Sequence, residues 1–288
     1  MIQAAELPLN ERGAVYHLDL LPEELSDTII TVGDPSRVGQ ISQYFDAIEV
    51  KRAHREFVTH TGRIGEKRLS VISTGIGVPN IDIVMNELDA LVNIDLSTRQ
   101  PKSVLKQLTI VRLGTTGSLQ RHCEPGDIVL SRFAIGFDTL LDYYPHWQTP
   151  QLQALRIALM AQLDGHSGSF YLAAADESLV DYFSAMGITG ITATCGGFYG
   201  PQGRRLRLPL TYPNLLSQLT NFDFDHHKIT NFEMETAGIL GMGQLLGHRC
   251  LSISVVLANR ITGVFAQNVK ELVEQLIEQA LQRLVYLN

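Results

Sequence analysis

Apolar residues along the chain alternate between a strand-like and a helix-like pattern. A β-branched run at 28–32 meets a short turn at 33–36, after which apolar residues recur at helical spacing as far as Phe45. The same order returns with a strand at 69–73, a glycine turn at 74–77 and a helix from about 79 to 91, and a third strand at 109–113 runs into a glycine turn at 114–117. The N-terminal part therefore predicts repeated strand, turn and helix units.

Further segments continue this alternation toward the C-terminus. Strands are predicted at 127–135, 169–174, 191–194 and 250–257, and helices at 151–163, 236–246 and 269–287. Because strands alternate with helices and several strands are apolar throughout, the sequence predicts an α/β fold whose sheet is covered on both faces. The segments 93–108 and 199–228 are expected to be loops or lids. Neither a repeat nor a Pro- or Ser-rich linker divides the sequence, which favours a single domain over residues 1–288.

Composition and charge narrow the class of protein. The 288 residues are 45% hydrophobic and 18% charged, which is typical of a chain that folds around a substantial core. A net charge of -7 argues against nucleic-acid or anionic-membrane partners, which need clustered cations. The sequence shows no secretory signal and no apolar run long enough for a membrane span. Cys123, Cys195 and Cys250 suit neither a disulfide framework nor a zinc site, so we expect free thiols and no metal. Together with the missing secretory signal, this predicts a cytoplasmic protein.

Three of the predicted strands end in turns that combine glycine with hydroxyl residues. Glycine lets backbone N–H groups approach an anion closely, and ligands of open α/β sheets bind at the carboxyl ends of strands. The turns at 33–36, 74–77 and 114–117 are therefore expected to line one crevice that holds phosphate, although glycine also serves in ordinary tight turns. A Walker A loop and a Gly-x-Gly-x-x-Gly motif are both missing, which argues against nucleoside triphosphates and NAD.

Three arginines accompany these turns, and guanidinium is a planar, permanently charged partner for phosphate. Arg112 lies in an otherwise apolar strand, where a charge is costly without a partner anion. A structural salt bridge would explain it, but ligand binding is the interpretation that we favour. On the residues alone, Arg37 and Arg55 are equally well explained as exposed surface charges.

Seven short motifs occur in a fixed order along the chain. They are Gly-Asp-Pro-Ser-Arg (33–37), His-Arg-Glu-Phe (54–57), Ser-Thr-Gly-Ile-Gly (73–77), Arg-Leu-Gly-Thr-Thr-Gly (112–117), Phe-Tyr-Gly-Pro-Gln-Gly-Arg (198–204), Asn-Phe-Glu-Met-Glu (231–235) and Asn-Arg (259–260). Over nearly its full length the sequence thereby resembles uridine phosphorylases of the nucleoside phosphorylase superfamily. The resemblance implies a single α/β domain, with a mixed, partly barrel-like central sheet flanked by helices in three layers. It also implies homodimers with shared active sites, which commonly build homohexamers.

The resemblance assigns roles to individual residues. The phosphate site would contain Gly33, Arg37, Arg112 and Thr115, with Arg55 reaching into the neighbouring subunit's pocket. The ribose site would contain Thr115, Glu233, Met234 and Glu235, with His17 donated across the dimer. The base pocket would be formed by Thr116, Gly117, Phe198, Gln202, Arg204, Leu257 and Ala258. On the residues alone, His17 would be a surface histidine, the two glutamates would favour the dipole of the next helix, and Gln202 and Arg204 would lie in a solvated loop.

The reaction implied by the resemblance is phosphorolysis, in which uridine and phosphate give uracil and ribose 1-phosphate. The catalytic residues would be Arg112, Glu235, Gln202 and Arg204. Arginines would fix the phosphate beneath the sugar, while Gln202 and Arg204 would stabilise negative charge on the departing base. No cofactor is needed, because phosphate is the co-substrate. Asn80 replaces a small hydroxyl near the family's monovalent-cation position, which argues against that ion.

Two alternatives remain open. Related purine nucleoside phosphorylases and water-using nucleosidases generally carry an aspartate after the late strand, whereas 255–262 has no acid, which favours a pyrimidine. A nucleoside-binding protein without catalysis would lack a phosphate or ribose residue, and none is missing. We expect Arg112→Ala to abolish phosphorolysis and to leave the fold intact.

Overall fold

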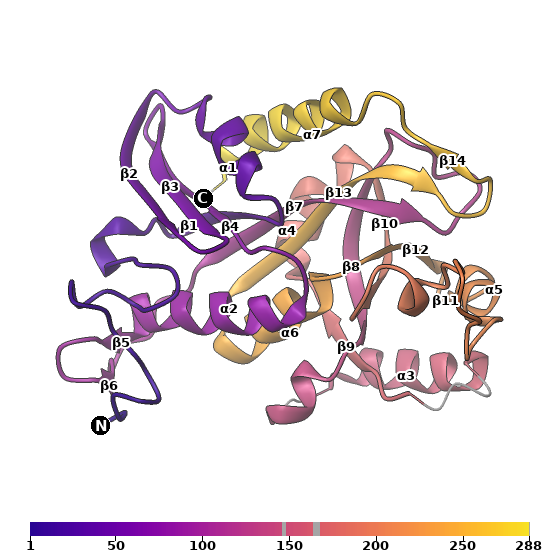
Figure 1. Cartoon of the computed structure of the whole chain (residues 1–288), viewed down its shortest axis with the longest axis horizontal. Coiled ribbons are helices and arrows are strands. Elements are labelled where there is room, and N and C mark those ends of the chain that lie inside the picture. Colours follow the sequence, from indigo (N-terminus) through magenta and orange to yellow (C-terminus); the bar gives the residue numbers. More distant parts are fainter. Residues whose placement is uncertain (146–147, 164–167, 288) are drawn as a thin grey trace.

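The computed structural model describes residues 1–145, 148–163 and 168–287 (Figure 1). Its strands are β1 (Thr28–Val32), β2 (Ala47–His54), β3 (Phe57–Ile64), β4 (Lys67–Ser73), β5 (Ile94–Asp95), β6 (Gln100–Pro101), β7 (Thr109–Ser118), β8 (Ile128–Phe137), β9 (Tyr171–Ala174), β10 (Ile188–Cys195), β11 (Asp223–Phe224), β12 (His227–Glu233), β13 (Arg249–Asn259) and β14 (Val264–Phe265). Its α-helices are α1 (Pro35–Ser42), α2 (Val78–Asn93), α3 (Pro150–Gln162), α4 (Glu177–Phe183), α5 (Leu215–Thr220), α6 (Thr236–Leu246) and α7 (Val269–Leu284).

Five strands close into a barrel. β12, β10, β8, β13 and β7 are paired in that order, and β7 pairs in turn with β12. The closing seam between β7 and β12 is antiparallel and short, with Ser118 opposite Asn231 and Gly117 opposite Phe232. The β8–β13 pair is also antiparallel, whereas the other three pairs of the ring are parallel. The α/β fold that the sequence pattern predicts, and the mixed, partly barrel-like sheet that the resemblance implies, are both confirmed.

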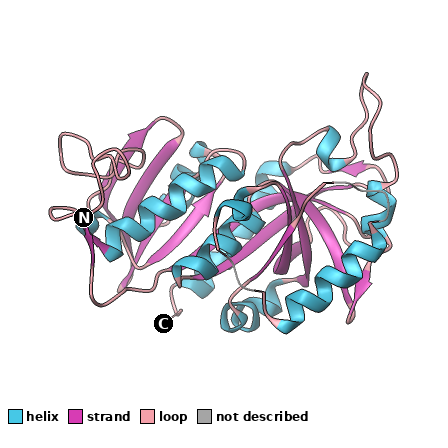
Figure 2. Cartoon of the chain, turned by 90° about the horizontal axis from the view of Figure 1, so that it is seen from below, coloured by secondary structure: helices cyan, strands magenta, loops and turns pink. Residues whose placement is uncertain are grey.

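The sheet continues outward from β7 through β1, β4, β3 and β2, with helices on both faces (Figure 2). Alternate side chains of a strand point to opposite faces, so neighbouring residues of β1 enter different cores. Ile29 packs in the cluster that contains Leu88 of α2 and Leu240 of α6. Ile30 packs instead with Ile41 of α1 and residues of α7. A third apolar cluster joins α3 to β8, β9 and β10.

Each strand and helix predicted from the sequence has a counterpart in the structure, but the prediction missed the hairpin of β2 and β3, the helix α4, the short strand β14 and the barrel strand β12. β2 forms the edge of the sheet and is largely exposed, so its residues carry little of the apolar pattern on which the prediction depends. The one-domain prediction stays a prediction, and it is supported by the single large sheet that takes strands from residue 28 to residue 265.

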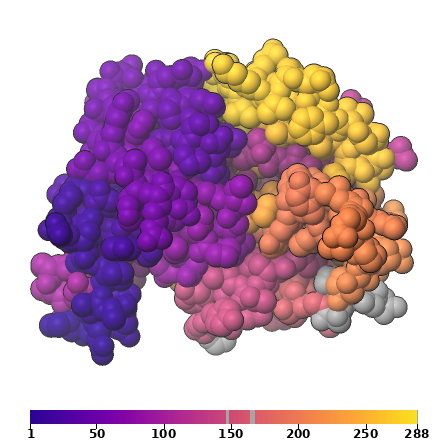
Figure 3. All heavy atoms as spheres, viewed as in Figure 1, coloured from indigo at the N-terminus to yellow at the C-terminus, as the bar shows by residue number. Residues whose placement is uncertain are grey.

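The two predicted loops need correction. The segment 93–108 contains the short hairpin β5–β6, which lies beside the N-terminal residues at one end of the molecule (Figures 1 and 3). The Ile2 N–H donates to the Arg99 carbonyl over 2.8 Å. The segment 199–228 contains α5 and β11, and Leu215 and Leu219 of α5 are buried in the cluster around α3. Tertiary contacts to these apolar side chains, rather than local periodicity, order the segment.

None of the helices in the described part of the chain combines the length and the apolar character needed to cross a membrane.

Gly136 of β8 lies opposite Tyr171 of β9 and makes room for its ring. A Cβ at this position would stand 2.2 Å from the buried tyrosine ring. We expect Gly136→Ala to lower the free energy of unfolding by about 1–3 kcal/mol, because the added atom overpacks the site. Gly39→Ala in α1 is the matched control, since its Cβ would meet nothing within 4 Å and alanine favours a helix. Urea unfolding measures both, and an unchanged midpoint for Gly136→Ala would contradict this account.

Candidate active site

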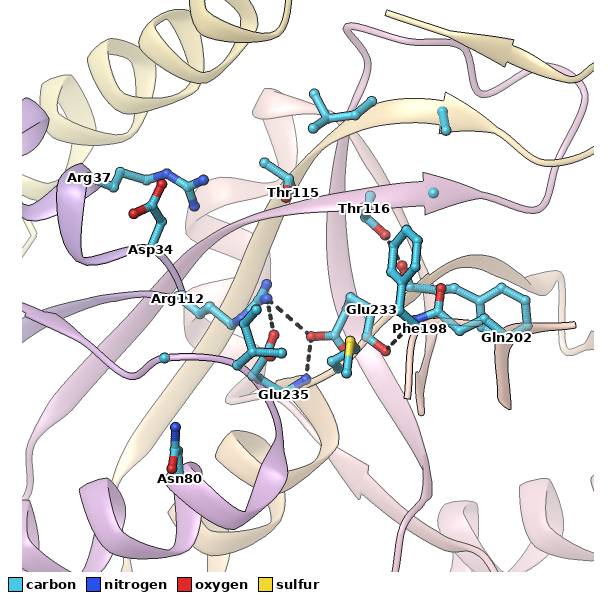
Figure 4. Close-up of a pocket in the computed structure, with 18 of the residues that line it drawn as sticks. Asp34, Arg37, Asn80, Arg112, Thr115, Thr116, Phe198, Gln202, Glu233 and Glu235 are labelled. Carbon is cyan, nitrogen blue, oxygen red and sulfur yellow. Dashed lines mark hydrogen bonds and ion pairs between the residues drawn. The ribbon is translucent and has the colours of Figure 1, made fainter. Parts of the chain in front are cut away.

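A pocket of about 780 Å³ lies where several strands end. The turn after β1, the turn after β4 and the second half of β7 contribute to its wall, so the three glycine segments do line one cavity. Further wall comes from the start of α1, the β2–β3 turn, α2, the segment 198–204, β12 with the residues that follow it, β13 and β14 (Figure 4). Residues from distant parts of the sequence thus meet around one space.

Most of the residues predicted for the site line this pocket. They are Gly33, Arg37, Arg112, Thr115, Thr116, Gly117, Phe198, Gln202, Arg204, Glu233, Met234, Glu235, Leu257 and Ala258. Two predicted residues do not line it. His17 is turned to Glu87, with its Nδ1 2.6 Å from the carboxylate, and Arg55 is exposed.

Some lining residues were not predicted as site residues. Glu56, Ile76 and Phe265 line the pocket, as do Asp34, Pro35, Gly75, Asn80 and Phe232. The His-Arg-Glu-Phe motif at 54–57 is a sequence signal for Glu56 as well as for its arginine. Phe265 carries no local signal, because only the pairing of β14 with β13 brings it over the pocket. The Asn80 amide donates to the Glu56 carboxylate over 3.1 Å, which ties the start of α2 to the β2–β3 turn.

Arg112 lies at the centre of the site and is 5% exposed. Its Nη2 is 2.6 Å from Glu235 Oε2 and 3.3 Å from Glu233 Oε2, and its Nη1 donates to the Ser254 hydroxyl over 3.2 Å (Figure 4). Burial opposes its charge, but the two carboxylates together raise the pKa of Arg112. Both explanations offered by the sequence therefore apply, since Arg112 forms a buried ion pair and also faces the pocket.

The segment 114–117 is not a turn, which corrects the prediction. It continues β7, with Gly114 paired to Ser254 and Thr116 to Val256 of β13. Gly114 has a different role: a Cβ there would lie 1.8 Å from Nη1 of Arg112. The guanidinium folds over this position, two residues along the same face of the strand. Glycine is thus required so that Arg112 can reach the centre of the barrel mouth.

Glu235 joins the ion pair to the second glycine turn. Its Oε2 accepts from Arg112, while its Oε1 accepts from the backbone N–H of Gly77 over 2.7 Å. The anion that this amide binds is therefore the protein's own carboxylate. Burial raises the pKa of Glu235, and the opposing charge of Arg112 counteracts that effect. Gly77 has a φ of 96°, a conformation that favours glycine.

Glu233 caps the helix that follows it. Its Oε2 accepts from the backbone N–H groups of Glu235 and Thr236, each over 2.8 Å, and its Oε1 accepts from the Thr194 hydroxyl. Such a carboxylate satisfies otherwise unpaired N–H groups and stabilises the positive end of the helix dipole. The helix-dipole alternative therefore holds for Glu233, in addition to its position in the pocket wall.

Arg37 is half-buried at the opposite end of the pocket from Gln202 (Figure 4). Its Nη1 donates to the Leu113 carbonyl over 3.3 Å. Among the described residues no carboxylate lies within ion-pairing distance of it; the Asp34 carboxylate, which caps α1 by accepting from the Ser36 N–H, acts on it only from farther away. Burial and the charge of Arg112 both lower the pKa of Arg37. An anion placed between Arg37 and Arg112 would relieve this repulsion.

The other end of the pocket is built around Gln202, which is 2% exposed and therefore does not lie in a solvated loop. The Arg204 guanidinium donates to the Gln202 side-chain oxygen and stacks over the Phe198 ring at 3.7 Å from its centroid. Arg260 donates to the Gln202 carbonyl over 3.0 Å. Burial, together with Arg260, lowers the pKa of Arg204 to about 10, so it stays charged at neutral pH.

Comparison with known proteins identifies the family. The model of the phosphorylase superfamily matches residues 27–286. The uridine phosphorylase of Thermococcus kodakarensis is 30% identical over 267 residues, which cover 92% of this chain and 84% of that protein. The uridine phosphorylase of Escherichia coli is 27% identical over 257 residues, or 86% and 87% of the two chains. A solved Trypanosoma brucei nucleoside phosphorylase, described as showing uridine phosphorylase activity, has a TM-score of 0.87 and 30% identity, covering 98% of this chain and 100% of that one.

The chain therefore belongs to the phosphorylase superfamily. The predicted class of activity, a nucleoside phosphorolysis of the uridine phosphorylase type, is confirmed at this level.

Arg112→Ala is expected to lower the free energy of unfolding by about 3–5 kcal/mol, because it leaves two buried carboxylates without their cation. The expectation from the sequence that this variant keeps its fold intact is thereby revised. Arg63→Ala removes an exposed ion pair to Glu49 and is the matched control, with an expected loss below about 1 kcal/mol. Urea unfolding at neutral pH compares the two variants.

The deficit of Arg112→Ala should depend on pH. Burial raises the pKa of Glu235, and the variant lacks the cation that opposes this shift. A carboxyl with a higher pKa in the folded than in the unfolded chain binds protons more strongly when folded, so stability increases as pH falls. The deficit should shrink between about pH 8 and about pH 5. A deficit that stays constant over this interval would show that the carboxylates are not its cause.

Proposed function

We propose that the pocket cleaves uridine with inorganic phosphate to give uracil and ribose 1-phosphate. The observation that carries this proposal is the distribution of charge along the cavity. Arg112 at the centre is neutralised by Glu235, whereas Arg37 at one end and Arg204 at the other have no carboxylate within ion-pairing distance among the described residues. A reaction that places a phosphate dianion at one end, and in which negative charge develops on a departing base at the other, fits this pattern.

Phosphate is proposed to bind between Arg37 and Arg112, against Gly33 and the Thr115 side chain. A dianion there is attracted by two guanidinium groups, which are suited to bind phosphate oxygens. Held beneath the sugar, its oxygen attacks the anomeric carbon with little further loss of orientational freedom. The bond from this carbon to phosphate oxygen forms as the bond to the base nitrogen breaks.

The ribose is proposed to lie over Met234 and Glu235. The Glu235 carboxylate is already fixed by Arg112 and the Gly77 amide, and it has remaining lone pairs for sugar hydroxyls. A carboxylate held in this way does not have to reorganise when the sugar develops positive charge, which is the condition for electrostatic stabilisation of the transition state.

The base is proposed to lie against Gln202 and Arg204, with Phe198, Thr116, Gly117, Leu257 and Ala258 shaping the pocket around it. The electron pair of the broken bond leaves with uracil, so negative charge accumulates on its ring nitrogen and carbonyl oxygens. Arg204 is oriented by Phe198 and by the Gln202 side chain. The lack of an acid in the segment after β13 supports a pyrimidine, as the sequence indicates.

We also propose that the active sites are shared in a homodimer, which could assemble further into a homohexamer. Arg55 supports this proposal, because it is exposed and lies outside its own pocket in a two-residue turn between His54 and Phe57. Its φ of 55° is unfavourable for a non-glycine residue, and such strain often marks a functional position. His17 likewise lies outside its own pocket. The three buried, free cysteines are consistent with the predicted cytoplasmic location.

Arg37→Ala tests the phosphate site. We expect KM for phosphate to rise by about 10- to 100-fold, because a charge-assisted hydrogen bond contributes about 1.5–3 kcal/mol. KM for uridine should change much less, and Arg63→Ala, remote from the pocket, should change neither. Steady-state kinetics with each substrate varied in turn gives both constants. Equal increases in the two KM values would place Arg37 outside the phosphate site.

A nucleoside panel tests the reaction. Uridine, deoxyuridine, thymidine and inosine are incubated with and without phosphate, and the free base and sugar products are separated. We expect uracil and ribose 1-phosphate from uridine only when phosphate is present. Free ribose without phosphate would indicate a hydrolytic nucleosidase, and cleavage of inosine with uridine intact would indicate a purine nucleoside phosphorylase.

A further inference from the structure

A chain of buried hydrogen bonds crosses the barrel behind the base end of the pocket. The Ser131 and Thr192 hydroxyls are 2.6 Å apart, and Thr192 donates to Asn231 Oδ1 over 3.0 Å. Asn231 Nδ2 donates to the Thr116 hydroxyl over 2.8 Å, and Thr116 donates to the Phe232 carbonyl over 2.6 Å. These side chains come from β8, β10, β12 and β7, and all are buried.

The direction of this chain is fixed, because each hydroxyl has only one proton to donate. Thr116 gives its proton to the Phe232 carbonyl and must therefore accept from Asn231. Thr192 gives its proton to Asn231 and must therefore accept from Ser131. Asn231 is the link between the two halves, since its oxygen accepts and its NH2 group donates. The Thr230 hydroxyl lies 2.7 Å from Asn231 Oδ1 and 3.2 Å from the Ile191 carbonyl, and it shares its one proton between these two acceptors.

The chain ends at the seam that closes the barrel. Two residue pairs join β7 to β12, and the Leu119 N–H donates to the Thr230 carbonyl over 2.7 Å just beyond them, so side-chain bonds across the seam reinforce a short backbone ladder. Thr116 and Gly117 on one side of the seam and Phe232 on the other all line the pocket. Arg37, in contrast, lies on α1 after the turn that follows β1. A loosened seam would therefore widen the nucleoside end of the pocket and leave the phosphate end in place.

We propose that Asn231 is a positioning residue for the nucleoside: through Thr116 and the Phe232 carbonyl, its amide holds the two halves of the base-pocket wall together. The proposal rests on the proposed function, because it places the nucleoside at this end. The proposal goes beyond that function because Asn231 does not itself line the pocket and would act on the nucleoside only through Thr116 and Phe232.

Asn231→Leu and Thr116→Val break the same chain at different links. Each should raise KM for uridine by about 10- to 100-fold, the cost of unmade buried hydrogen bonds, with KM for phosphate changed less than about threefold. The double variant should be little worse than the more damaged single variant, because residues of one network are not additive. Additive losses, or an equal rise in both KM values, would overturn the proposal.

Asn231→Asp tests the donor directly. A protonated carboxyl can replace the amide donor toward Thr116, whereas a carboxylate cannot. Charged groups on the surrounding segments include Glu233, two residues along β12, Arg112 on β7 and Arg260 after β13, whose guanidinium lies 6.0 Å from the centre of the neighbouring Phe232 ring. β8 and β10 present the uncharged Ser131 and Thr192 hydroxyls.

At about pH 5.5, where burial keeps an aspartic acid protonated, kcat/KM for uridine in Asn231→Asp should approach the wild-type value at the same pH. Asn231→Leu should remain impaired there. Asn93→Asp is the matched control: Asn93 is a buried amide on α2, so its replacement should cost stability without changing the ratio of the two KM values. All rates are measured below the melting temperature of the least stable variant.

Asn231→Asp that behaves like Asn231→Leu at every pH would overturn the donor role. If Asn93→Asp also raised KM for uridine but not KM for phosphate, the change in the Asn231 variants would be explained by a general loss of stability, and the proposal would fail. Wild-type protein that leaves uridine intact would instead refute the proposed substrate, and the nucleoside that it does cleave would then replace uridine in the same comparison.

Discussion

The buried ion pair between Arg112 and Glu235 is the interaction on which the site depends. It joins β7 to the start of α6, and through the Gly77 amide it also fixes the turn after β4. Glu233 adds a second carboxylate that caps α6. Buried charges are tolerated only when they are paired and hydrogen-bonded, and this cluster meets that condition without help from solvent. A polar site is thereby held rigid before any substrate arrives.

The barrel around this cluster contains two buried polar layers: Arg112 with Glu233 near the mouth, and Thr116 with Asn231 behind the base wall. In both layers each group has a partner, so the cost of burying polar atoms is offset by directional bonds. Directional bonds also specify geometry more strictly than apolar packing does. The polar interior thus serves the positioning of the pocket walls.

The arginines of the pocket divide into two kinds. Arg112 is neutralised and supplies a fixed frame, whereas Arg37 and Arg204, near the ends of the cavity, form no ion pair with a described residue, and burial lowers the pKa of both. A group already paired is preorganised but has little charge left to attract a ligand. An unpaired, partly buried cation is destabilised until an anion arrives, which makes it a strong contributor to binding. A site of this kind needs both: an unpaired arginine attracts an anionic ligand, and a paired arginine keeps the surrounding groups in a fixed position.

The sequence by itself determined those regular elements that carry a clear apolar pattern, and most of the residue types of the site. Apolar periodicity is a local property, so it located β1, β4, β7, α2 and α6, and the ordered motifs pointed to the residues that line the pocket. Only the tertiary structure decided which partner each polar group takes. It placed 114–117 in a strand beneath Arg112, gave the Gly77 amide to Glu235, ordered β2 and β3 at the sheet edge, and closed the barrel between β7 and β12. These outcomes depend on contacts between residues far apart in the chain. No local sequence pattern specifies which distant group will accept a hydrogen bond from a given donor, or which side chain will pack against a given glycine.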